Sequence, residues 1–347
     1  MAANGVARTE RILGELAKVD GAAPDPANLS AKHTKMMANP FRFYRGSAGL
    51  FYADLADGVI VLPSGLSEPR TVTRIVGDCH LSNFGLFTED GSHKDDVIFA
   101  PNDFDDACEG LAAWDILRCI VSFHLAADLG RGWLSGQYKD DDDALDGDDP
   151  EDLEAASEED AREAVKAFLK AYRSTSNDIA SDPDKRLKVI DKVSKNHVLA
   201  KPFKKAKDRA PGGEDFESKS SLADVASWAD GRPHLLTSAE EDIDDLDKEL
   251  HRLPREVEQS VKRAFRPYLD DDILDLAERR GAGTGSLNVK RYYFLVGPWD
   301  YAGAGDLALC HIVEAKQQRA AAPLARFPDL SPANRMNAAH LTCDCQR

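Results

Sequence analysis

Two short acidic segments hold the residues whose types and spacing could carry out chemistry. The first, GDCHLSNF, carries Asp78 and, five residues later, Asn83; the second, NDFDDA, carries Asp103. An aspartate can accept the proton of an attacking hydroxyl, and asparagine and aspartate supply the neutral and anionic oxygens that Mg²⁺ prefers. The layout predicts a phosphotransferase centre in which Asp78, Asn83 and Asp103 are catalytic and Asn83 and Asp103 bind the metal.

Each segment follows an expected strand, which would position it. Thr71–Val76 contains alternating β-branched residues, and Val97–Ala100 is a second apolar run. Gly77 and Pro101 then break the strands and release the chain into loops. If these two strands pair as a hairpin, the three polar side chains converge on one cleft.

Further charged residues surround the second segment. We expect Asp105 and Asp106 at the start of a following helix, because carboxylates are favoured at helix N-termini. Asp105 is also a candidate for a second metal contact. The apolar periodicity predicts a long helix from Trp114 to about Leu129. Asp115 and Arg118 are three residues apart on it, and we expect them to pair on its surface.

The two motifs resemble those of known families. GDCHLSNF is similar to the catalytic loop of the aminoglycoside- and choline-kinase-like enzymes, and NDFDDA to their metal-binding loop. The block from Lys32 to Leu129, with KMMANPFRFYRG near its start and WDILR after the acidic loop, resembles the uncharacterised bacterial family called domain of unknown function 2252. The resemblance implies a protein-kinase-like fold, the cofactors ATP and Mg²⁺, and a small-molecule phosphate acceptor.

The same resemblance draws attention to Arg45. An aromatic-x-Arg-Gly element belongs to the shared core of that family, and an arginine before a glycine can present its guanidinium to a phosphate. Arg45 is therefore a candidate nucleotide contact. Capping of a helix by Arg45, or its pairing with one of the many acidic residues, is an equal alternative.

The C-terminal part supplies a candidate nucleotide-binding sheet. Strands are expected at Leu287–Val296 and Leu307–Val313, the second ending near Lys316. This pair resembles the sheet of kinase-like proteins in which backbone N–H groups cover the phosphates and a lysine contacts them. The cofactor-binding candidates are Lys316 and the glycines of the preceding turn, Gly281, Gly283 and Gly285.

The order of these features predicts a circular permutation. In ordinary kinases the glycine-rich sheet precedes the catalytic loop, whereas here it follows by roughly two hundred residues. We expect an α+β chain with a catalytic-loop and helical lobe over residues 1–280 and a partial nucleotide-binding lobe over residues 281–347. The chain is shorter than its resembled family, and the lysine lacks an evident glutamate partner on a following helix.

Composition excludes several classes of function. The formal charge of −17 over 347 residues argues against nucleic acid as a general partner. An apolar run of membrane-spanning length and a secretory signal are both missing, which predicts a soluble, cytoplasmic protein without membrane contact. Six cysteines without a CxxC pair predict reduced thiols. The segment 139–160 is acidic and poor in aromatic residues, so we expect an exposed, disordered insert.

Three functions remain open at this level. The leading one is an ATP- and Mg²⁺-dependent phosphotransferase that acts on an unidentified small molecule. The second is a catalytically inactive kinase-like module that binds nucleotide or a partner protein, which the short C-terminus and the missing lysine partner favour. The third is a metal-dependent phosphoesterase, suggested by Asp78-Cys79-His80 after a strand, although the later motifs of that class are missing.

Overall fold

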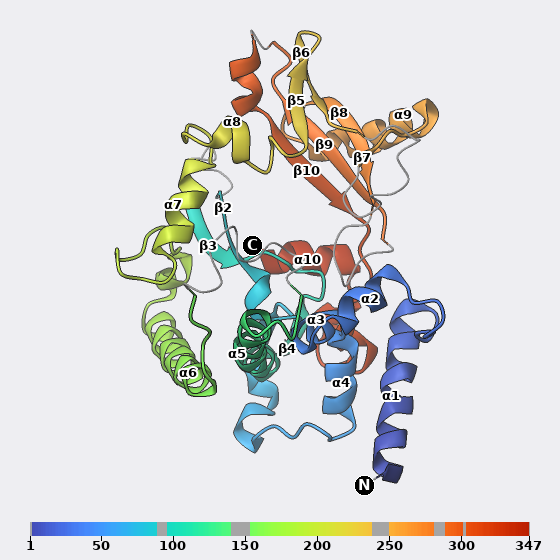
Figure 1. The fold of residues 1–347 in the computed structure, drawn as a ribbon, viewed down its shortest axis with the longest axis vertical. Helices are drawn as coiled ribbons and strands as arrows, with labels where there is room; N and C mark the ends of the chain where they lie inside the picture. Colours follow the sequence, from blue (N-terminus) through green and yellow to red (C-terminus); the bar gives the residue numbers. More distant parts are fainter. Residues whose placement is uncertain are drawn as a thin grey trace. The chain divides into compact units, whose positions relative to one another are not determined.

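The computed structural model is an α+β protein (Figure 1). It describes residues 2–88, 96–139, 153–237, 250–280, 289–300 and 303–346. The chain divides into two compact units: unit 1 comprises Met1–Gly85, Pro101–Lys188 and Gln318–Arg347, and unit 2 comprises Leu86–Ala100 and Val189–Gln317. The boundary expected after residue 280 falls inside unit 2. None of the helices in these ranges has the length and hydropathy needed to cross a membrane.

Unit 1 is mainly helical. Its helices are α1 (Ala2–Asp20), α2 (Ala31–Met37), α3 (Pro40–Gly46), α4 (Ala48–Ala56), α5 (Ala112–Leu134), α6 (Glu158–Ser181) and α10 (Ala338–Gln346). Local signals set several of their ends. The Ser30 hydroxyl accepts the His33 N–H at the start of α2, and the Asn39 side chain accepts the Arg42 N–H at the start of α3. Pro40 occupies the first turn of α3, where its missing N–H costs nothing.

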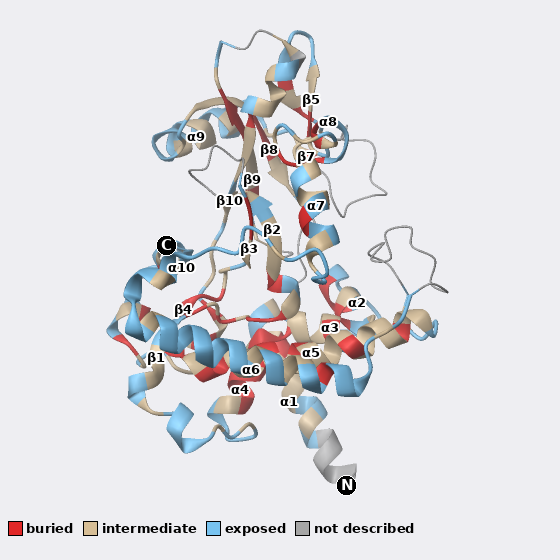
Figure 2. Cartoon of the chain, turned by 90° about the vertical axis from the view of Figure 1, so that its left-hand side faces the viewer, coloured by how far each residue is buried: buried red, intermediate tan, exposed pale blue. Residues whose placement is uncertain are grey.

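The acidic insert ends in ordered helix. Ser157 and Asp160 form a capping box at the start of α6, so the last residues of the segment 139–160 are helical and not a loop. The described residues of the insert, 153–160, are nearly all exposed, as expected. Residues 140–152 lie outside the described ranges. Figure 2 shows α6 as largely exposed, while buried residues gather around α4 and α5.

Two short antiparallel strand pairs frame the acidic loops. β1 (Val72–Ile75) pairs with β4 (Cys108–Leu111), and β2 (Phe84–Thr88) pairs with β3 (Val97–Pro101). The strands expected at Thr71–Val76 and Val97–Ala100 are confirmed as β1 and β3. Their expected pairing with each other is wrong, because each has another partner. In the β1–β4 ladder Ile75 lies opposite Cys108, so the loop that leaves β1 starts beside the loop that enters β4.

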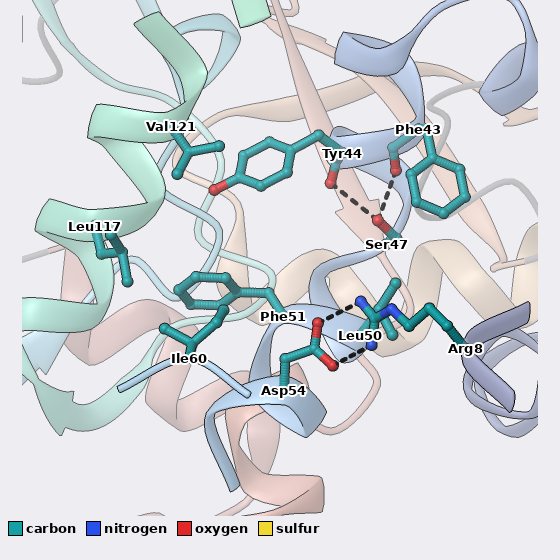
Figure 3. A pocket seen from close by; sticks show the side chains of 10 residues that line it. All are labelled: Arg8, Phe43, Tyr44, Ser47, Leu50, Phe51, Asp54, Ile60, Leu117 and Val121. Atoms are coloured by element: carbon teal, nitrogen blue, oxygen red, sulfur yellow. Dashed lines mark hydrogen bonds and ion pairs between the residues drawn. The ribbon is translucent and has the colours of Figure 1, made fainter. Parts of the chain in front are cut away.

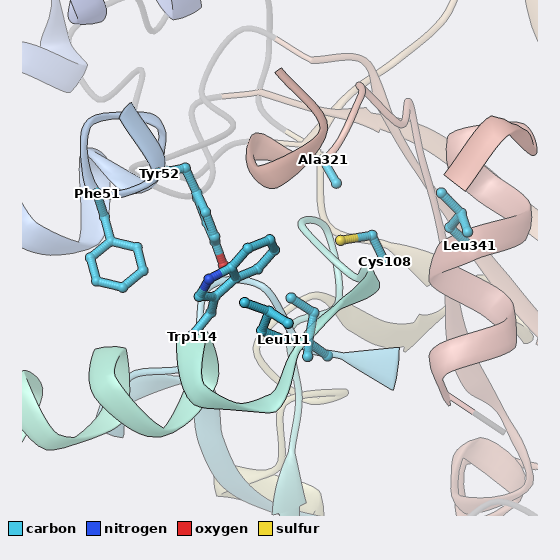
Figure 4. Packing of buried hydrophobic residues seen from close by; sticks show 8 residues of the cluster. Phe51, Tyr52, Cys108, Leu111, Trp114, Ala321 and Leu341 are labelled. Atoms are coloured by element: carbon cyan, nitrogen blue, oxygen red, sulfur yellow. The ribbon is translucent and has the colours of Figure 1, made fainter. Parts of the chain in front are cut away.

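The core of unit 1 joins distant parts of the chain (Figure 4). The rings of Tyr52 and Trp114 meet edge-on, 5.4 Å apart, and the ring of Phe327 lies 4.8 Å from that of Trp114. Such aromatic pairs contribute roughly 0.5–1.5 kcal/mol each beyond their buried area. Residues after 317 therefore complete this core. Its buried members are Phe51, Tyr52, Ile75, Cys108, Leu111, Trp114, Ala321 and Leu341.

Unit 2 contains an antiparallel sheet with the strand order β10-β9-β8-β7. The strands are β7 (Leu250–His251), β8 (Asp272–Arg279), β9 (Arg291–Gly297) and β10 (His311–Lys316). A separate hairpin joins β5 (Ala226–Ala229) to β6 (Arg232–Leu235), and the helices are α7 (Ala200–Asp208), α8 (Phe216–Lys219) and α9 (Arg255–Phe265). The expected strand pair is therefore present as β9 and β10, with shifted ends and as part of a larger sheet.

The sequence pattern did not predict strand β8, because an acidic residue interrupts its apolar residues. Asp275 is buried at a register shift of β8. Its carboxylate accepts the N–H groups of Leu235 and Leu276 and pairs with Arg252 at 2.5 Å. These partners compensate the cost of burying the charge, and hydrogen bonds to the carboxylate keep the pKa of Asp275 below its usual value against the opposing effect of burial.

Candidate functional site

Two loops of unit 1 carry the predicted catalytic residues. We call residues 76–83 the Asp78 loop and residues 102–107 the Asp103 loop. The backbone N–H of Asn102 donates to the carbonyl of Asn83 at 3.1 Å, which joins the start of one loop to the end of the other. A second contact lies at Gly77, whose backbone faces the carbonyl of Asp106. The structure therefore brings the two loops into direct contact.

Gly77 permits this contact for two reasons. Its φ is +81°, and a Cβ atom there would lie 1.9 Å from the Asp106 carbonyl oxygen. We expect Gly77→Ala to destabilise the protein well beyond the roughly 1–2 kcal/mol cost of a left-handed backbone alone. Gly58→Ala is the matched control, since Gly58 has φ +69° and open space around it. Urea unfolding of both variants measures the difference, and equal losses would contradict the close approach.

Asp78 is held by a buried arginine from α5. The Nε atom of Arg118 lies 2.5 Å from Asp78 Oδ1, and the Arg118 side chain is 0% exposed, against 17% for Asp78. The guanidinium lies over the ring of Tyr44, 4.2 Å from its centroid, and donates through Nη2 to the Tyr44 carbonyl at 2.9 Å. The Asp78 carboxylate is thus oriented through Oδ1, while Oδ2 lies 3.7 Å from His80 Nε2.

Asp115 holds the backbone of the same loop. Its carboxylate accepts the N–H groups of Val76 at 2.7 Å and Gly77 at 3.0 Å. The Tyr52 hydroxyl donates to the Gly77 carbonyl at 2.5 Å. Three hydrogen bonds, of which the one from Tyr52 is buried, therefore fix the two residues that precede Asp78.

The expectation that Asp115 and Arg118 pair with each other on the helix surface is wrong. Arg118 is buried and Asp115 is half-buried, and both contact the Asp78 loop. A spacing of three residues between opposite charges is typical of exposed helix faces, so local sequence favoured the surface. The family resemblance includes the WDILR segment, but the spacing of the two charges did not indicate that their side chains contact the Asp78 loop.

Asp115 gives a testable pH dependence. Burial raises the pKa of Asp115 to about 6, above the value near 4 of an unfolded aspartate. Between these values the native state holds a proton that the unfolded state lacks. The free energy of unfolding therefore gains a contribution at low pH that is lost as pH rises through about 6, by at most about 1.4 kcal/mol per pH unit.

We expect Asp115→Asn to remove this contribution. The stability of the natural protein relative to this variant should then fall as pH rises from about 4 to about 6. Asp128→Asn, which changes a half-exposed carboxylate on the same helix, is the control. Urea unfolding across this pH range is the measurement, and parallel curves for the natural protein and Asp115→Asn would refute the assignment.

The predicted metal ligands lie on the joined loops. The Asn83 side chain is buried and donates through Nδ2 to the Asp78 carbonyl at 2.8 Å, which sets the orientation of its amide. Asp103 is exposed, and its Oδ1 accepts the Asp105 N–H at 3.2 Å. Amide and carboxylate oxygens are ligands that suit Mg²⁺.

A metal here would have few protein ligands. Among the residues that the structure describes, no group of three or more His, Cys, Asp or Glu side chains could hold a metal ion. Mg²⁺ commonly binds one or two protein oxygens and takes its other ligands from water and substrate phosphates. Asn83 and Asp103 fit that sparse donor set.

Asp105 and Asp106 do not start a helix, which corrects the expectation. Strand β4 lies between them and α5, because residues 108–111 pair with β1. The Asp105 carbonyl accepts from Gln318 Nε2 at 2.5 Å, and Asp106 Oδ1 accepts the Ala322 N–H at 2.7 Å. These two hydrogen bonds, from Gln318 and Ala322, thus hold the Asp103 loop against the C-terminal segment.

Arg45 lies in the last turn of α3, close enough to the Asp78 loop for its charge to act on His80. Burial, with the nearby charges of Arg118 and Arg45, lowers the pKa of His80 to about 3. His80 is therefore neutral at neutral pH and unsuited to be a cationic acid. Arg45 is close enough for its charge to act on this loop, which is consistent with either of its expected roles.

The remaining candidates belong to unit 2. Lys316 is the last residue of β10 and lies opposite Arg291 of β9. Glu314, two residues before it, pairs with Arg291 at 3.2 Å. Gly281, Gly283 and Gly285 lie outside the described residues.

A separate pocket of about 300 Å³ lies among the N-terminal helices (Figure 3). Its wall is mostly apolar, with the Arg8–Asp54 ion pair at one side. Tyr44 and Phe51 line it and also pack against the Arg118 guanidinium. The described residues around it include none of the predicted site residues. They are Arg8, Phe43, Tyr44, Ser47, Leu50, Phe51, Asp54, Ile60, Leu117 and Val121.

Comparison with known proteins gives a match to one family model over part of the chain. Residues 24–131 match the model of a family described as "Uncharacterized protein conserved in bacteria (DUF2252)". This segment holds Arg45, both loops and most of α5, and it confirms the resemblance to that family over this range. Neither the curated proteins nor the solved structures compared with the chain gave a match.

Proposed function

We propose that this protein is an ATP- and Mg²⁺-dependent phosphotransferase that acts on a small molecule. The observation that carries the proposal is the joining of the Asp78 and Asp103 loops through the Asn102–Asn83 hydrogen bond and the Gly77–Asp106 contact. One centre then holds a carboxylate for the attacking hydroxyl and two oxygen ligands for a metal.

In this proposal each side chain has a role. Asp78 Oδ1 is engaged by Arg118, so Oδ2 is the oxygen that would accept the proton of the acceptor hydroxyl. Asn83 and Asp103 would hold Mg²⁺, which when bound neutralises charge on the nucleotide phosphates. Phosphoryl transfer depends mainly on positioning and charge stabilisation, so a carboxylate kept in one orientation serves it well.

The nucleotide contacts of this proposal rest on the resemblance. It assigns Lys316 and the glycine-rich turn to the phosphates, with Arg45 as a further contact. It also implies a circularly permuted kinase-like fold, because the loops of unit 1 precede the sheet of β9 and β10 in the chain. A cytoplasmic location belongs to the same proposal.

A second candidate function is a nucleotide-binding module without catalysis. The observation that favours it is the Asp78–Arg118 pair, since one oxygen of the Asp78 carboxylate is already engaged by a buried arginine. The phosphoesterase alternative receives no support. A two-metal centre needs several carboxylate or histidine ligands, and the described part of the chain contains no such cluster.

Calorimetry with ATP tests the proposal. Asp103→Asn should weaken Mg²⁺-dependent ATP binding, and Lys316→Ala should weaken it with or without metal, each by roughly tenfold or more for a lost charged contact. Asp224→Asn and Lys290→Ala, exposed residues of unit 2, are the matched controls. Absence of nucleotide binding by the folded natural protein would refute the phosphotransferase and leave the inactive module only as a protein that binds a partner. An effect of Asp103→Asn alone would keep the metal site and reject the lysine.

A further inference from the structure

Three cationic residues lie side by side across the antiparallel sheet of unit 2. In the β9–β10 ladder Arg291 lies opposite Lys316. In the β8–β9 ladder Glu278 lies opposite Tyr292, so the next residue of β8, Arg279, comes beside Arg291. Side chains directly opposite each other in an antiparallel pair share one face of the sheet, with Cβ atoms about 5 Å apart. We call Arg279, Arg291 and Lys316 the cation row.

The neighbouring row of the same face adds one carboxylate. Tyr293 lies opposite Ala277 on one side and Glu314 on the other, two residues along each strand from the cation row. The two rows therefore carry three positive charges and one negative charge, in a chain whose formal charge is −17. Because like charges directly opposite each other destabilise a sheet, the arrangement favours a bound anion.

Contacts within the two rows hold both guanidinium groups in place. Arg291 is 9% exposed, and its Nη1 lies 3.2 Å from Glu314 Oε1. The guanidinium of Arg279 lies against the ring of Tyr293, 5.4 Å from its centroid. In the part of the chain that the structure describes, no carboxylate forms an ion pair with Arg279. Arg279 is thus positioned and keeps its charge available to a ligand.

A small anion can reach the cation row from solvent. Arg279 and Lys316 are half-buried, and Glu314 beside them is exposed. Neighbouring strands lie about 4.8 Å apart, so a row across three strands spans roughly 10 Å. One phosphate group covers only part of that length, whereas linked phosphate groups can contact all three cations.

We propose that the cation row binds a di- or triphosphate group, with Arg279 and Arg291 as guanidinium donors and Lys316 as the third cation. A guanidinium group can donate two parallel hydrogen bonds to phosphate oxygens, which a lysine cannot. The inference deepens the proposed function and rests on it for one point, that the phosphates belong to a nucleotide. The two arginines are additional to the predicted nucleotide contacts.

Calorimetry with inorganic tripolyphosphate, in the absence of Mg²⁺, tests the cation row directly. Arg279→Gln should weaken binding by about tenfold or more, because it removes a charged hydrogen-bond donor. Arg280→Gln is the matched control, since it removes the same charge from the next residue. Arg280 pairs with Glu278, on the other face of the sheet, at 2.8 Å. At about 0.15 M salt its loss should leave the affinity nearly unchanged.

Glu314→Gln should change the affinity in the opposite direction. This substitution removes the carboxylate beside the cation row, so tripolyphosphate should bind several-fold more tightly. If Arg279 and Glu314 only supported the fold, neither substitution would tighten binding. Circular dichroism at the assay temperature shows that each variant is folded before its affinity is measured.

Two results would overturn the inference. One is that the folded natural protein does not bind tripolyphosphate at millimolar concentration. The other is that Arg279→Gln and Arg280→Gln weaken binding equally, because the binding would then reflect overall charge. Binding of ATP without binding of tripolyphosphate would reject the cation row and leave the phosphotransferase proposal standing. Binding of tripolyphosphate without binding of ATP would support the cation row and reject the nucleotide.

Discussion

Replacement of Arg118 by methionine should lower the free energy of unfolding by about 3–5 kcal/mol, the usual cost of breaking a buried ion pair. Methionine fills similar volume, so the loss comes from charge and hydrogen bonding. The substitution removes the partner of Asp78 and the donor to the Tyr44 carbonyl. Urea unfolding, followed by circular dichroism, measures the change.

The control for this variant lies on the same helix. Arg131 is 40% exposed and pairs with Asp128 at 3.7 Å, so Arg131→Met should cost less than about 1 kcal/mol. The double variant Asp78→Asn with Arg118→Met should recover part of the loss, since it no longer leaves a buried charge unpaired. A cost for Arg118→Met as small as that of the control would show that the pair contributes little to stability.

Asp78→Asn should lower the rate of phosphoryl transfer by about 10²–10⁴-fold, the usual contribution of a positioned general base. An amide cannot accept the proton of the attacking group, although it has nearly the same shape. Because the acceptor is unknown, the readout is the hydrolysis of ATP by water in the presence of Mg²⁺. Affinity for ATP, measured by calorimetry, should change little.

Stability must be followed in parallel, since Asp78→Asn leaves Arg118 without its anion. Assays belong at a temperature where the variant is shown to be folded. Asp128→Asn, which removes an exposed carboxylate from α5, should keep the full rate. If Asp78→Asn hydrolyses ATP as fast as the natural protein, Asp78 is not the base. If the natural protein binds ATP and never turns it over, the inactive-module candidate is preferred.

Local sequence predicted the parts of the site that depend on neighbours along the chain. Asn83 and Asp78 are five residues apart, and their hydrogen bond forms within one loop. The strand before Gly77 and the glycine itself follow from backbone preferences that need no tertiary partner. Those preferences operate over a few residues, which is the range that pattern analysis can see.

The partners of the acidic residues depended on burial, which local patterns do not reveal. Asp115 and Arg118 have the spacing of a surface ion pair, yet each is compensated inside the protein by the Asp78 loop, about 40 residues away in the chain. Asp106 looked like a helix start and instead accepts the N–H of Ala322. A buried charge is tolerated only where distant partners meet it, so sequence alone favours the surface.

Sequence by itself thus determined which loop bears Asp78 and Asn83, which bears Asp103, and what chemistry these side chains can offer. Tertiary structure decided that β1 pairs with β4, that Arg118 engages Oδ1 of Asp78, and that residues after Gln317 return to unit 1. The physical reason is that these contacts gain free energy from burial shared between distant segments. The backbone preferences of each segment do not specify which distant segment it packs against.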